Sequence, residues 1–500
     1  KGNYLKIGDW KMNKCHLVLF NLTHVNTALK QHNINEVHGI IGADVLQKGR
    51  GNNASGVIQV GADNSSEVTQ TGFYFGGSNQ SGVIQLGADN GSEVTQAGIS
   101  NTSGVLQIGA GNESYVNQQG TGPFFFGGNT SLVAQGGLEN YSDVDQEGVF
   151  NQSGVLQLGA NNGSIVDQDG LSNISGVAQL GAVNGSGVFQ NGAGNLSGVL
   201  QVGGFNGSLV GQFGTGNASG VAQLGAGNGS VVGQFGSDNT SGVLQQGLAN
   251  FSGVVQLGED NFSAVSQDGE FNGSLVYQEG EFNSSDVDQR GEYNLSGVYQ
   301  EGAANESRVK QRGEANGSAV VQLGDGNYSK VTQRGEANGS LVWQDGIDNT
   351  SRVKQKGDEN GSIVAQLGDK NKSRVDQEGD GNGSIVYQEG FKNRSFVDQE
   401  GDGNGSIVYQ EGRKNRSDVD QKKDGNGSIV AQIGKRNESS VQQDGFDNAS
   451  IVYQEGKDNS SEVEQIGGTA TENLSIVAQI GDDNTSFVKQ NRESNESYVL

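Results

Sequence analysis

The chain has 500 residues, a formal net charge of −26 and a hydrophobic content of 32%, well below the share found in ordinary globular domains. Such a composition cannot fill thick apolar cores, and its acidic balance argues against nucleic acid or an anionic membrane surface as a partner, because like charges repel. Cysteine occurs once, so no internal disulfide can hold the fold. No apolar run reaches about 18 residues, which predicts that no segment inserts into a membrane as a helix.

Residues 1–50 do not follow the pattern of the rest of the chain. The segment from Gly39 to Leu46 has the sequence GIIGADVL and resembles the segment near the C-terminal end of retropepsin-like aspartic proteases. No Asp-Thr-Gly or Asp-Ser-Gly triplet precedes it, so the acid pair for hydrolysis is absent and Asp44 would be structural. We expect residues 1–50 to form a non-repetitive cap, or a protease-like remnant, over the first coil of the region that follows.

Residues 51–500 repeat the pattern Asn-x-Ser-x-Val-x-Gln-x-Gly-x-x about forty times, with a period of about eleven residues. The repeated residues occupy alternate positions, which is the periodicity of a β-strand, and Gly with two variable residues supplies a turn. The intervening positions take residues of every kind, so they face outward. The pattern predicts an all-β fold, a β-solenoid in which each coil holds two strands and about 22 residues.

Stacked coils place like residues over like residues at about 4.8 Å, as in cross-β assemblies. We therefore expect buried ladders of Asn and Gln amides and of Ser hydroxyls, each group satisfied by its copies above and below. About twenty such coils would form a rod about 100 Å long. Two repeats represent the predicted ladders: Asn382, Ser384, Val386, Gln388 and Gly390 in one, and Asn404, Ser406, Val408, Gln410 and Gly412 in the other.

The repeat resembles the curlin repeat of curli, the functional amyloid fibres of bacterial biofilms. The residues that carry the resemblance are, for example, Ser153, Val155, Gln157, Gly159, Asn162, Ser164, Val166 and Gln168. Curlin subunits contain a handful of repeats and often have Ala where this chain always has Ser. The resemblance implies a cross-β stacked solenoid, a fibre-forming role, no enzymatic activity and no cofactor.

Each repeat is also an Asn-x-Ser sequon for N-glycosylation. Representative acceptors would be Asn53, Asn64, Asn140, Asn151 and Asn162. The alternation instead places Asn inside the coil, where a glycan cannot fit. Ser is used throughout, although glycosylation accepts Thr equally, so we favour the structural ladder and keep a glycan-coated fibril as the alternative.

Three insertions, near residues 71–78, 120–128 and 468–472, interrupt the repeats. The first two are aromatic and would emerge on one edge of the solenoid, whereas the third is polar and would emerge on the other. Exposed aromatic loops suggest a lateral or adhesive contact, and a local plug is the alternative. The aromatic residues concerned are Phe73, Tyr74, Phe75, Phe124, Phe125 and Phe126.

The outward apolar residues change strands half-way along the chain. In the first half they lie on one set of alternate strands, as Leu156 and Leu158 do, and in the second half on the other set. A single solenoid needs no apolar outer face, so we expect rods to pack side by side with a stagger of half a length. In the second half these contacts would include Tyr387, Tyr409 and Tyr453.

The turns of the C-terminal part are sorted by charge. One edge carries Asp380, Asp402 and Asp424, and the other carries Lys392, Arg413, Lys414, Lys435 and Arg436. Stacked like charges repel, so we expect an offset from outside the column, by lateral ion pairs or bound cations, with a merely solvated edge as the alternative.

Together these features predict a homopolymeric, extracellular or cell-surface fibre subunit of a biofilm or surface matrix. It would assemble by edge-templated β-stacking and lateral packing. Its partners would be copies of itself, with cations or glycans at the turns as further candidates. A discrete adhesin or ice-binding solenoid is the competing class, although the varied outward residues do not form the uniform array that it would need.

Overall fold

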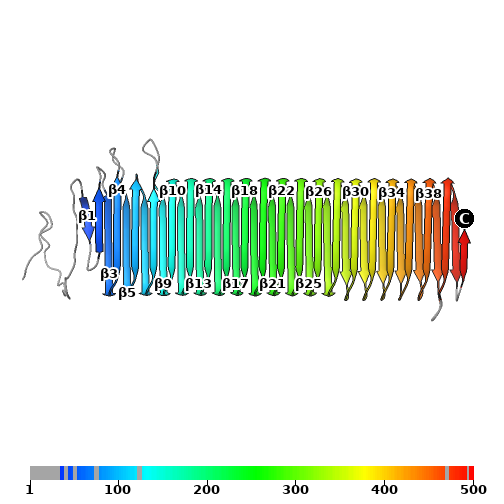
Figure 1. Ribbon diagram of the computed structural model, residues 1–500, viewed down its shortest axis with the longest axis horizontal. Helices are drawn as coiled ribbons and strands as arrows, with labels where there is room; N and C mark the ends of the chain where they lie inside the picture. Colours follow the sequence, from blue (N-terminus) through cyan, green and yellow to red (C-terminus); the bar gives the residue numbers. More distant parts are fainter. Residues whose placement is uncertain are drawn as a thin grey trace, which may run out of the picture.

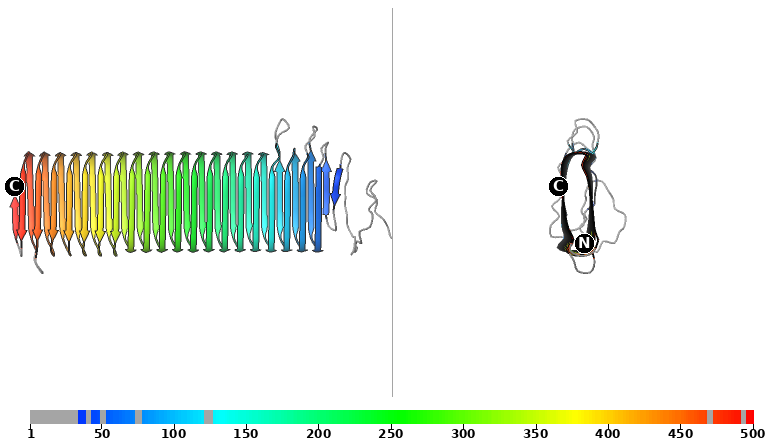
Figure 2. Two further views of the ribbon diagram at one scale, coloured as in Figure 1. Left: turned by 180° about the vertical axis from the view of Figure 1, so that it is seen from behind. Right: turned by 90° about the vertical axis from the view of Figure 1, so that its right-hand side faces the viewer.

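The computed structural model of the protein describes residues 34–38, 43–48, 53–72, 78–120, 127–467, 472–491 and 495–500. Within these ranges the regular structure consists of β-strands alone. The strands form a long, straight stack with two layers, and the chain runs from one end of it to the other (Figure 1). Viewed along the axis, the coils overlie one another and give the outline of a single flattened coil (Figure 2).

Successive strands alternate between two parallel sheets. The odd sheet contains β1 (Ile34–His38), β3 (Asn53–Ala62), β5 (Gln80–Ala88), β7 (Thr102–Ala110), β9 (Thr130–Leu138), β11 (Gln152–Ala160), β13 (Ile174–Ala182), β15 (Leu196–Gly204), β17 (Ala218–Ala226), β19 (Thr240–Leu248), β21 (Phe262–Glu270), β23 (Ser284–Glu292), β25 (Glu306–Glu314), β27 (Tyr328–Glu336), β29 (Thr350–Lys356), β31 (Lys372–Glu378), β33 (Arg394–Glu400), β35 (Arg416–Lys422), β37 (Glu438–Asp444), β39 (Ser460–Ile466) and β41 (Thr485–Asn491). The even sheet contains β2 (Ala43–Lys48), β4 (Ser65–Gly72), β6 (Gly91–Gly98), β8 (Glu113–Gln119), β10 (Tyr141–Val149), β12 (Gly163–Leu171), β14 (Gly185–Ala193), β16 (Gly207–Thr215), β18 (Gly229–Ser237), β20 (Phe251–Glu259), β22 (Gly273–Glu281), β24 (Leu295–Ala303), β26 (Gly317–Asp325), β28 (Gly339–Ile347), β30 (Gly361–Asp369), β32 (Gly383–Phe391), β34 (Gly405–Arg413), β36 (Gly427–Lys435), β38 (Ala449–Lys457), β40 (Leu474–Asp482) and β42 (Glu496–Val499).

Each strand pairs with the strand one coil away, in register and in parallel. In β32 and β34, for example, Ser384 lies beside Ser406 and Gln388 beside Gln410, a separation of 22 residues. The fold class is therefore confirmed: the protein is a parallel β-solenoid of about 20 turns, with two strands per coil and no helix in the described part.

The solenoid includes two strands that precede residue 51. β1 pairs with β3, and β2 pairs in register with β4, so that Ala43, Val45 and Gln47 lie beside Ser66, Val68 and Gln70. These strands fall inside the segment for which we expected a cap or a protease-like remnant. The ADVL part of the GIIGADVL sequence is thus a strand of the solenoid. Most of residues 1–50 lie outside the described residues, and their role as a cap stays a prediction.

A single row of valines from each sheet forms the apolar core. Val386 and Val408 are fully buried, as is nearly every valine at this position of the described repeats. Burial of one such side chain contributes roughly 1.5–3 kcal/mol. The core is thin because the neighbouring inward rows are polar.

The three insertions interrupt the regular turns. The first two follow even strands, β4 and β8, and the third follows an odd strand, β39, so the connections leave opposite edges as expected. Phe73, Tyr74, Phe75, Phe124, Phe125 and Phe126 lie outside the described residues, and their contact role stays a prediction.

A glycine at or near the end of almost every strand is required by the close approach of two coils. Gly390 has φ of 107°, and a Cβ on it would lie 2.1 Å from the carbonyl oxygen of Gly412 in the next coil. Only glycine meets both demands without displacing backbone. Lys423 occupies the equivalent position one coil after Gly401, and it adopts φ of 68°, a conformation that costs an L-residue roughly 1 kcal/mol.

We predict that Gly390→Ala loosens the coils around β32, with a local cost of at least about 1–3 kcal/mol. The measurement is native-state amide hydrogen exchange, because long repeat arrays do not unfold in one step. Gly383→Ala is the matched control in the same strand, since its Cβ would meet nothing within 4 Å. Equal loss of protection in both variants would contradict this account of the turn.

Candidate functional site

The interior holds a continuous ladder of hydrogen-bonded glutamine amides in each sheet, and a row of buried asparagines along each line of turns. Gln388 Nε2 donates to Gln410 Oε1 at 2.7 Å and also to the carbonyl of Lys372, in the opposite sheet, at 3.1 Å. A glutamine within the stack therefore joins its own coil to the next coil and joins the two sheets. Both protons of the amide are used, which removes the cost of burying it.

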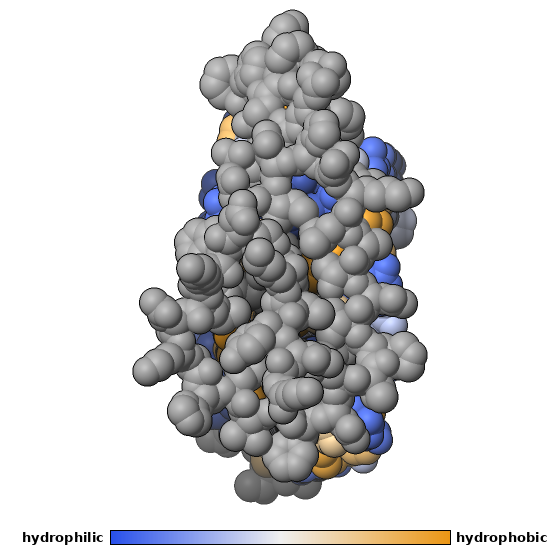
Figure 3. Space-filling model, turned by 90° about the vertical axis from the view of Figure 1, so that its left-hand side faces the viewer, coloured by the Kyte–Doolittle hydropathy of each residue, from blue (hydrophilic) through white to orange (hydrophobic). Residues whose placement is uncertain are grey.

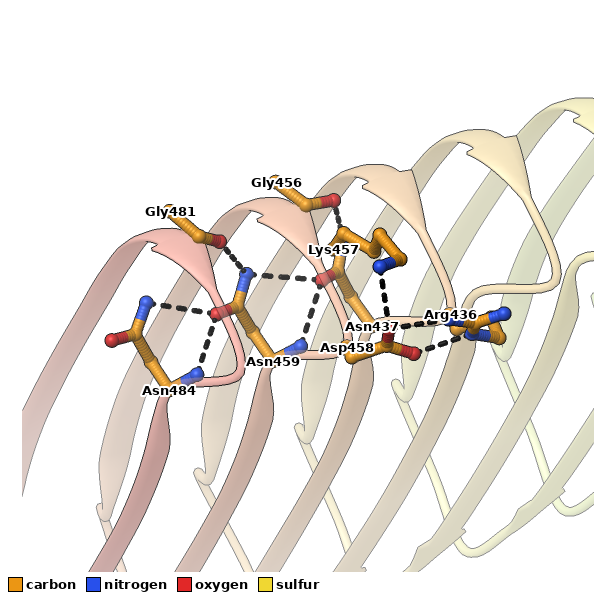
Figure 4. Close-up of polar contacts among 8 residues, drawn as sticks. All are labelled: Arg436, Asn437, Gly456, Lys457, Asp458, Asn459, Gly481 and Asn484. Atoms are coloured by element: carbon orange, nitrogen blue, oxygen red, sulfur yellow. Dashed lines mark hydrogen bonds and ion pairs between the residues drawn. The ribbon is translucent and has the colours of Figure 1, made fainter.

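The asparagine ladder runs along the turns. Asn459 Nδ2 donates to Asn437 Oδ1 at 3.1 Å and to the carbonyl of Gly481 at 2.8 Å, while the Asn459 backbone N–H donates to the same Asn437 oxygen at 3.2 Å. Asn484 repeats this arrangement on Asn459 (Figure 4). One side chain thus satisfies backbone groups that the tight turn would otherwise leave unpaired.

The serine row does not form the hydroxyl ladder that we expected. The Oγ atoms of Ser384 and Ser406 are buried and have no hydrogen-bond partner among the described residues. Coils lie about 4.8 Å apart, whereas a hydrogen bond between oxygens requires about 3 Å or less. An amide spans the gap because its donor and acceptor lie on different atoms, and a single hydroxyl oxygen cannot.

The structure places the predicted ladder residues as follows. Asn382, Ser384, Val386 and Gln388 are buried, as are Asn404, Ser406, Val408 and Gln410, and Gly390 and Gly412 close their strands with positive φ. Alternation alone indicated this inward face, because β-strand side chains point to opposite sides in turn.

Backbone hydrogen bonds link successive acidic turns of one column. The Asp380 backbone N–H donates to Asp402 Oδ1 at 2.9 Å, and the Asp402 N–H donates to Asp424 Oδ1 at 3.0 Å. An offset of the like charges from outside the column, by lateral ion pairs or bound cations, stays a prediction. The backbone bonds could not be predicted because they depend on turn geometry. Within the described ranges, no three His, Cys, Asp or Glu side chains are grouped so that they could hold a metal ion.

The opposite edge offsets its cations with aromatic and acidic neighbours. Lys392 Nζ and Arg413 Cζ lie 4.9 Å and 5.0 Å from the ring centre of Phe391, a favourable cation–π geometry. Arg436 pairs with Asp458, which also accepts from Lys457 (Figure 4). These pairs lower the pKa of the Asp458 carboxyl to about 2, chiefly through the hydrogen bond from Arg436.

The outer faces carry two shallow apolar grooves. One, of about 860 Å³, lies on the odd sheet and is lined by residues such as Leu156, Ala178 and Leu200. The other, of about 1130 Å³, lies on the even sheet and is lined by residues such as Ile385 and Ile407. The exchange of apolar residues between the two strand sets is thus an exchange between the two faces of one flat rod.

The predicted tyrosine contacts form part of the even face. Tyr387 and Tyr409 stack with ring centres 5.2 Å apart and an interplanar angle of 2°. Each tyrosine hydroxyl, including that of Tyr453, donates to the glutamate two residues later in its strand. The pKa of Tyr409 is raised to about 12, first by its hydrogen bond to Glu411, then by burial and by the charge of that glutamate.

Comparison with protein families identifies the repeat. The model described as the curlin associated repeat matches residues 42–72, 302–335, 330–357, 379–412, 396–422 and 434–467. The chain contains curlin repeats, in both halves of the solenoid. No curated protein matches the sequence significantly. The first match includes β2, which agrees with the pairing of that strand in the solenoid.

The curlin repeats place most of their sequon asparagines out of reach of a glycan. Asn53, Asn140, Asn151 and Asn162 are buried, and Asn140 Nδ2, the atom to which a glycan would attach, donates to Asn112 Oδ1 at 2.9 Å. Asn64 is only half-buried, and its Nδ2 donates to the carbonyl of Gly87 at 2.9 Å. This geometry does not favour the glycan-coated alternative.

We predict that Gln443→Leu weakens the coils around β37 by about 2–6 kcal/mol. The change leaves the Gln421 donor and the Gln465 acceptor without their buried partner, and each buried orphan costs about 1–3 kcal/mol. Gln442→Leu, at the neighbouring exposed position, is the control and should change little. Hydrogen exchange of β37 measures both, and equal effects would contradict the ladder.

We predict that the Tyr409 phenol keeps its proton until about pH 12. Because its folded pKa exceeds the ordinary value of 10.0, it favours the folded coil below pH 10, and this contribution disappears as the pH rises through about 12. Phenolate absorbance of the wild type minus that of Tyr409→Phe isolates this group. Glu411→Gln should return the transition toward pH 10, and an unchanged transition would contradict the assigned cause.

Proposed function

We propose that this curlin-repeat protein is a structural subunit of an extracellular amyloid-like fibre in a biofilm or surface matrix. The fibre grows by adding coils to the ends of the stack and thickens by side-by-side packing. The single observation that carries the proposal is the in-register stack, in which the glutamine side chains of successive coils are hydrogen-bonded to one another. Any chain with the same repeat can extend such a stack by the same bonds.

The glutamine ladder has a direction that suits head-to-tail growth. In the even sheet each Gln Nε2 donates toward the C-terminal end, from Gln47 to Gln70 at 2.8 Å through to Gln454 and Gln479 at 2.7 Å. At the β2 end, Gln47 Oε1 is buried and has no partner among the described residues. An amide donor from another copy would complete the ladder there.

The extracellular location rests on the curlin family, whose members are usually extracellular or attached to the cell surface. Its repeats are structural and not catalytic. In the described part of the chain, no helix has both the length and the hydrophobicity to cross a membrane. Some outward columns repeat one residue, as Ile385 and Ile407 do, whereas others change from coil to coil, as Phe391 and Arg413 do. The outer face as a whole is therefore not the uniform array that an ice-binding solenoid or a discrete adhesin would need.

Fibre diffraction of the full-length chain tests the proposal. We expect growth seeded by fragmented fibres, with an axial reflection at about 4.8 Å. Gln47→Leu should slow seeded elongation because it removes an end acceptor, whereas Gln442→Leu, on the outer surface, should not. A chain that stays monomeric at high concentration in the presence of seeds would overturn the proposed function.

A further inference from the structure

The outward charges of the solenoid are segregated by sheet and by half. The four outward positions of a strand are those that alternate with the buried Asn, Ser, Val and Gln. No outward position of the odd sheet from β3 to β19 is charged. In the even sheet, the first three outward positions of every strand from β24 to β40 are uncharged as well. We call these surfaces the odd apolar face and the even apolar face.

The remaining halves carry opposite charges. On β4 to β12 of the even sheet, every charged outward residue is acidic, and we call this group the acidic patch: Glu67, Glu93, Glu113, Asp143, Asp145, Glu147, Asp167 and Asp169. On β25 to β29 of the odd sheet, all charged outward residues except Glu306 are basic, and we call the basic ones the basic patch: Arg308, Lys310, Arg312, Lys330, Arg334, Arg352, Lys354 and Lys356.

Neighbours on the same rod neutralise these patches only in part. Lys310 pairs with Asp288 at 3.0 Å, but Lys330 and Arg334 form no ion pair with any described residue. In the acidic patch, burial and then the neighbouring carboxylates raise the pKa of Asp145 and of Asp167. Both patches therefore keep charges that are not neutralised on the same rod, and a surface of opposite charge would stabilise them.

Equal distances separate the matching surfaces along the rod. The odd apolar face has its middle at β11, and the even apolar face has its middle at β32. The axial distance between these two points is about ten coils, or about 48 Å. The basic patch has its middle at β27, and the acidic patch has its middle at β8. The axial distance between them is again about ten coils, measured toward the N-terminal end. Ten coils is about half of the described solenoid.

The flat shape of the rod permits contact along its whole length. The coils overlie one another in the axial view without visible rotation, and the two sheets form opposite broad faces (Figure 2). A copy moved sideways without rotation therefore lays its even sheet on the odd sheet of its neighbour. Seen from the β1 end, hydrophilic and hydrophobic residues both appear at the outer rim of the rod (Figure 3).

We propose that copies of this chain pack side by side in the same axial direction, odd sheet on even sheet, with an offset of about ten coils. The odd apolar face of one rod then lies on the even apolar face of a second. Its basic patch lies on the acidic patch of a third copy, which follows the second end to end. This arrangement rests on the proposed fibre and specifies the contact that thickens it.

Electrostatic repulsion disfavours a competing arrangement, the antiparallel pair of rods. An antiparallel pair with even sheet on even sheet would also bury apolar surface, but it would bring together the acidic edges of both faces, which include Glu389, Glu411 and Glu455. It would also leave the basic patch facing water. Like charges across an interface oppose association, and complementary ones fix the register.

Zero-length carbodiimide coupling tests the arrangement, because it joins a lysine to a carboxylate only in direct contact. In fibres grown from equal amounts of heavy-isotope and ordinary chains, we expect mixed-isotope links from Lys310, Lys330 or Lys354 to Glu93, Glu113 or Glu147. Lys330→Glu with Arg334→Glu should abolish these links and yield thinner fibres that keep the axial repeat. Lys414→Glu with Lys435→Glu, on a turn edge, is the matched control and should leave both unchanged.

Each other result has a definite meaning. Fibres that consist of single rods, links that join even sheet to even sheet, or widths unaffected by the Lys330 and Arg334 reversal would overturn the packing and leave the fibre function standing. Absence of fibres in the wild type would overturn the proposed function and this packing with it. Restored width when the reversed chain is mixed with Asp143→Lys, Asp145→Lys chains would support the assigned contact.

Discussion

A buried interior lined with amides is the constraint on which this structure depends. Two sheets enclose rows of Asn and Gln, and a buried amide without partners is costly. Only an identical residue one coil away offers a donor and an acceptor at the right height, as Gln410 does for Gln388. The parallel direction of the strands, the unshifted register and the fixed repeat length all follow from that demand, whereas the thin valine core alone would tolerate slippage.

Much of this architecture could be predicted because its determinants are local. Alternation of residues fixes which side chains face inward, and the spacing of Asn382 and Asn404 gives the length of a coil. β2 could also have been recognised, since Ala43, Val45 and Gln47 occupy the Ser, Val and Gln positions of a repeat. Only the Asn that begins a repeat is missing. The unpaired Ser384 hydroxyl and the bond from Asp380 to Asp402 could not, because they depend on distances between coils that a pattern of residues does not encode.

The outer surface follows a different rule. Outward residues pair with their immediate neighbours: a strand with Tyr387 has Glu389 two positions later, whereas a strand with Ala365 has Leu367 there. In the first case the hydroxyl donates to the carboxylate at 2.9 Å. In the second, two small or aliphatic side chains continue the apolar surface. The ladders leave these positions unconstrained, so their sequence carries information about contacts that the fold does not need.

Because the coils stack in register, an outward residue that recurs in successive coils meets copies of itself along a column. The favourable or unfavourable interaction between such copies is then repeated in every coil. Alternation of sign between coils relieves a charged column, as Lys489 does for Glu464 at 2.6 Å, but exposed pairs of this kind contribute only about 0–1 kcal/mol each. Stability of a single rod therefore does not explain why the bases collect on β25 to β29 and the acids on β4 to β12. A surface of opposite charge on another rod does explain it, because contact excludes water and strengthens the attraction between the patches.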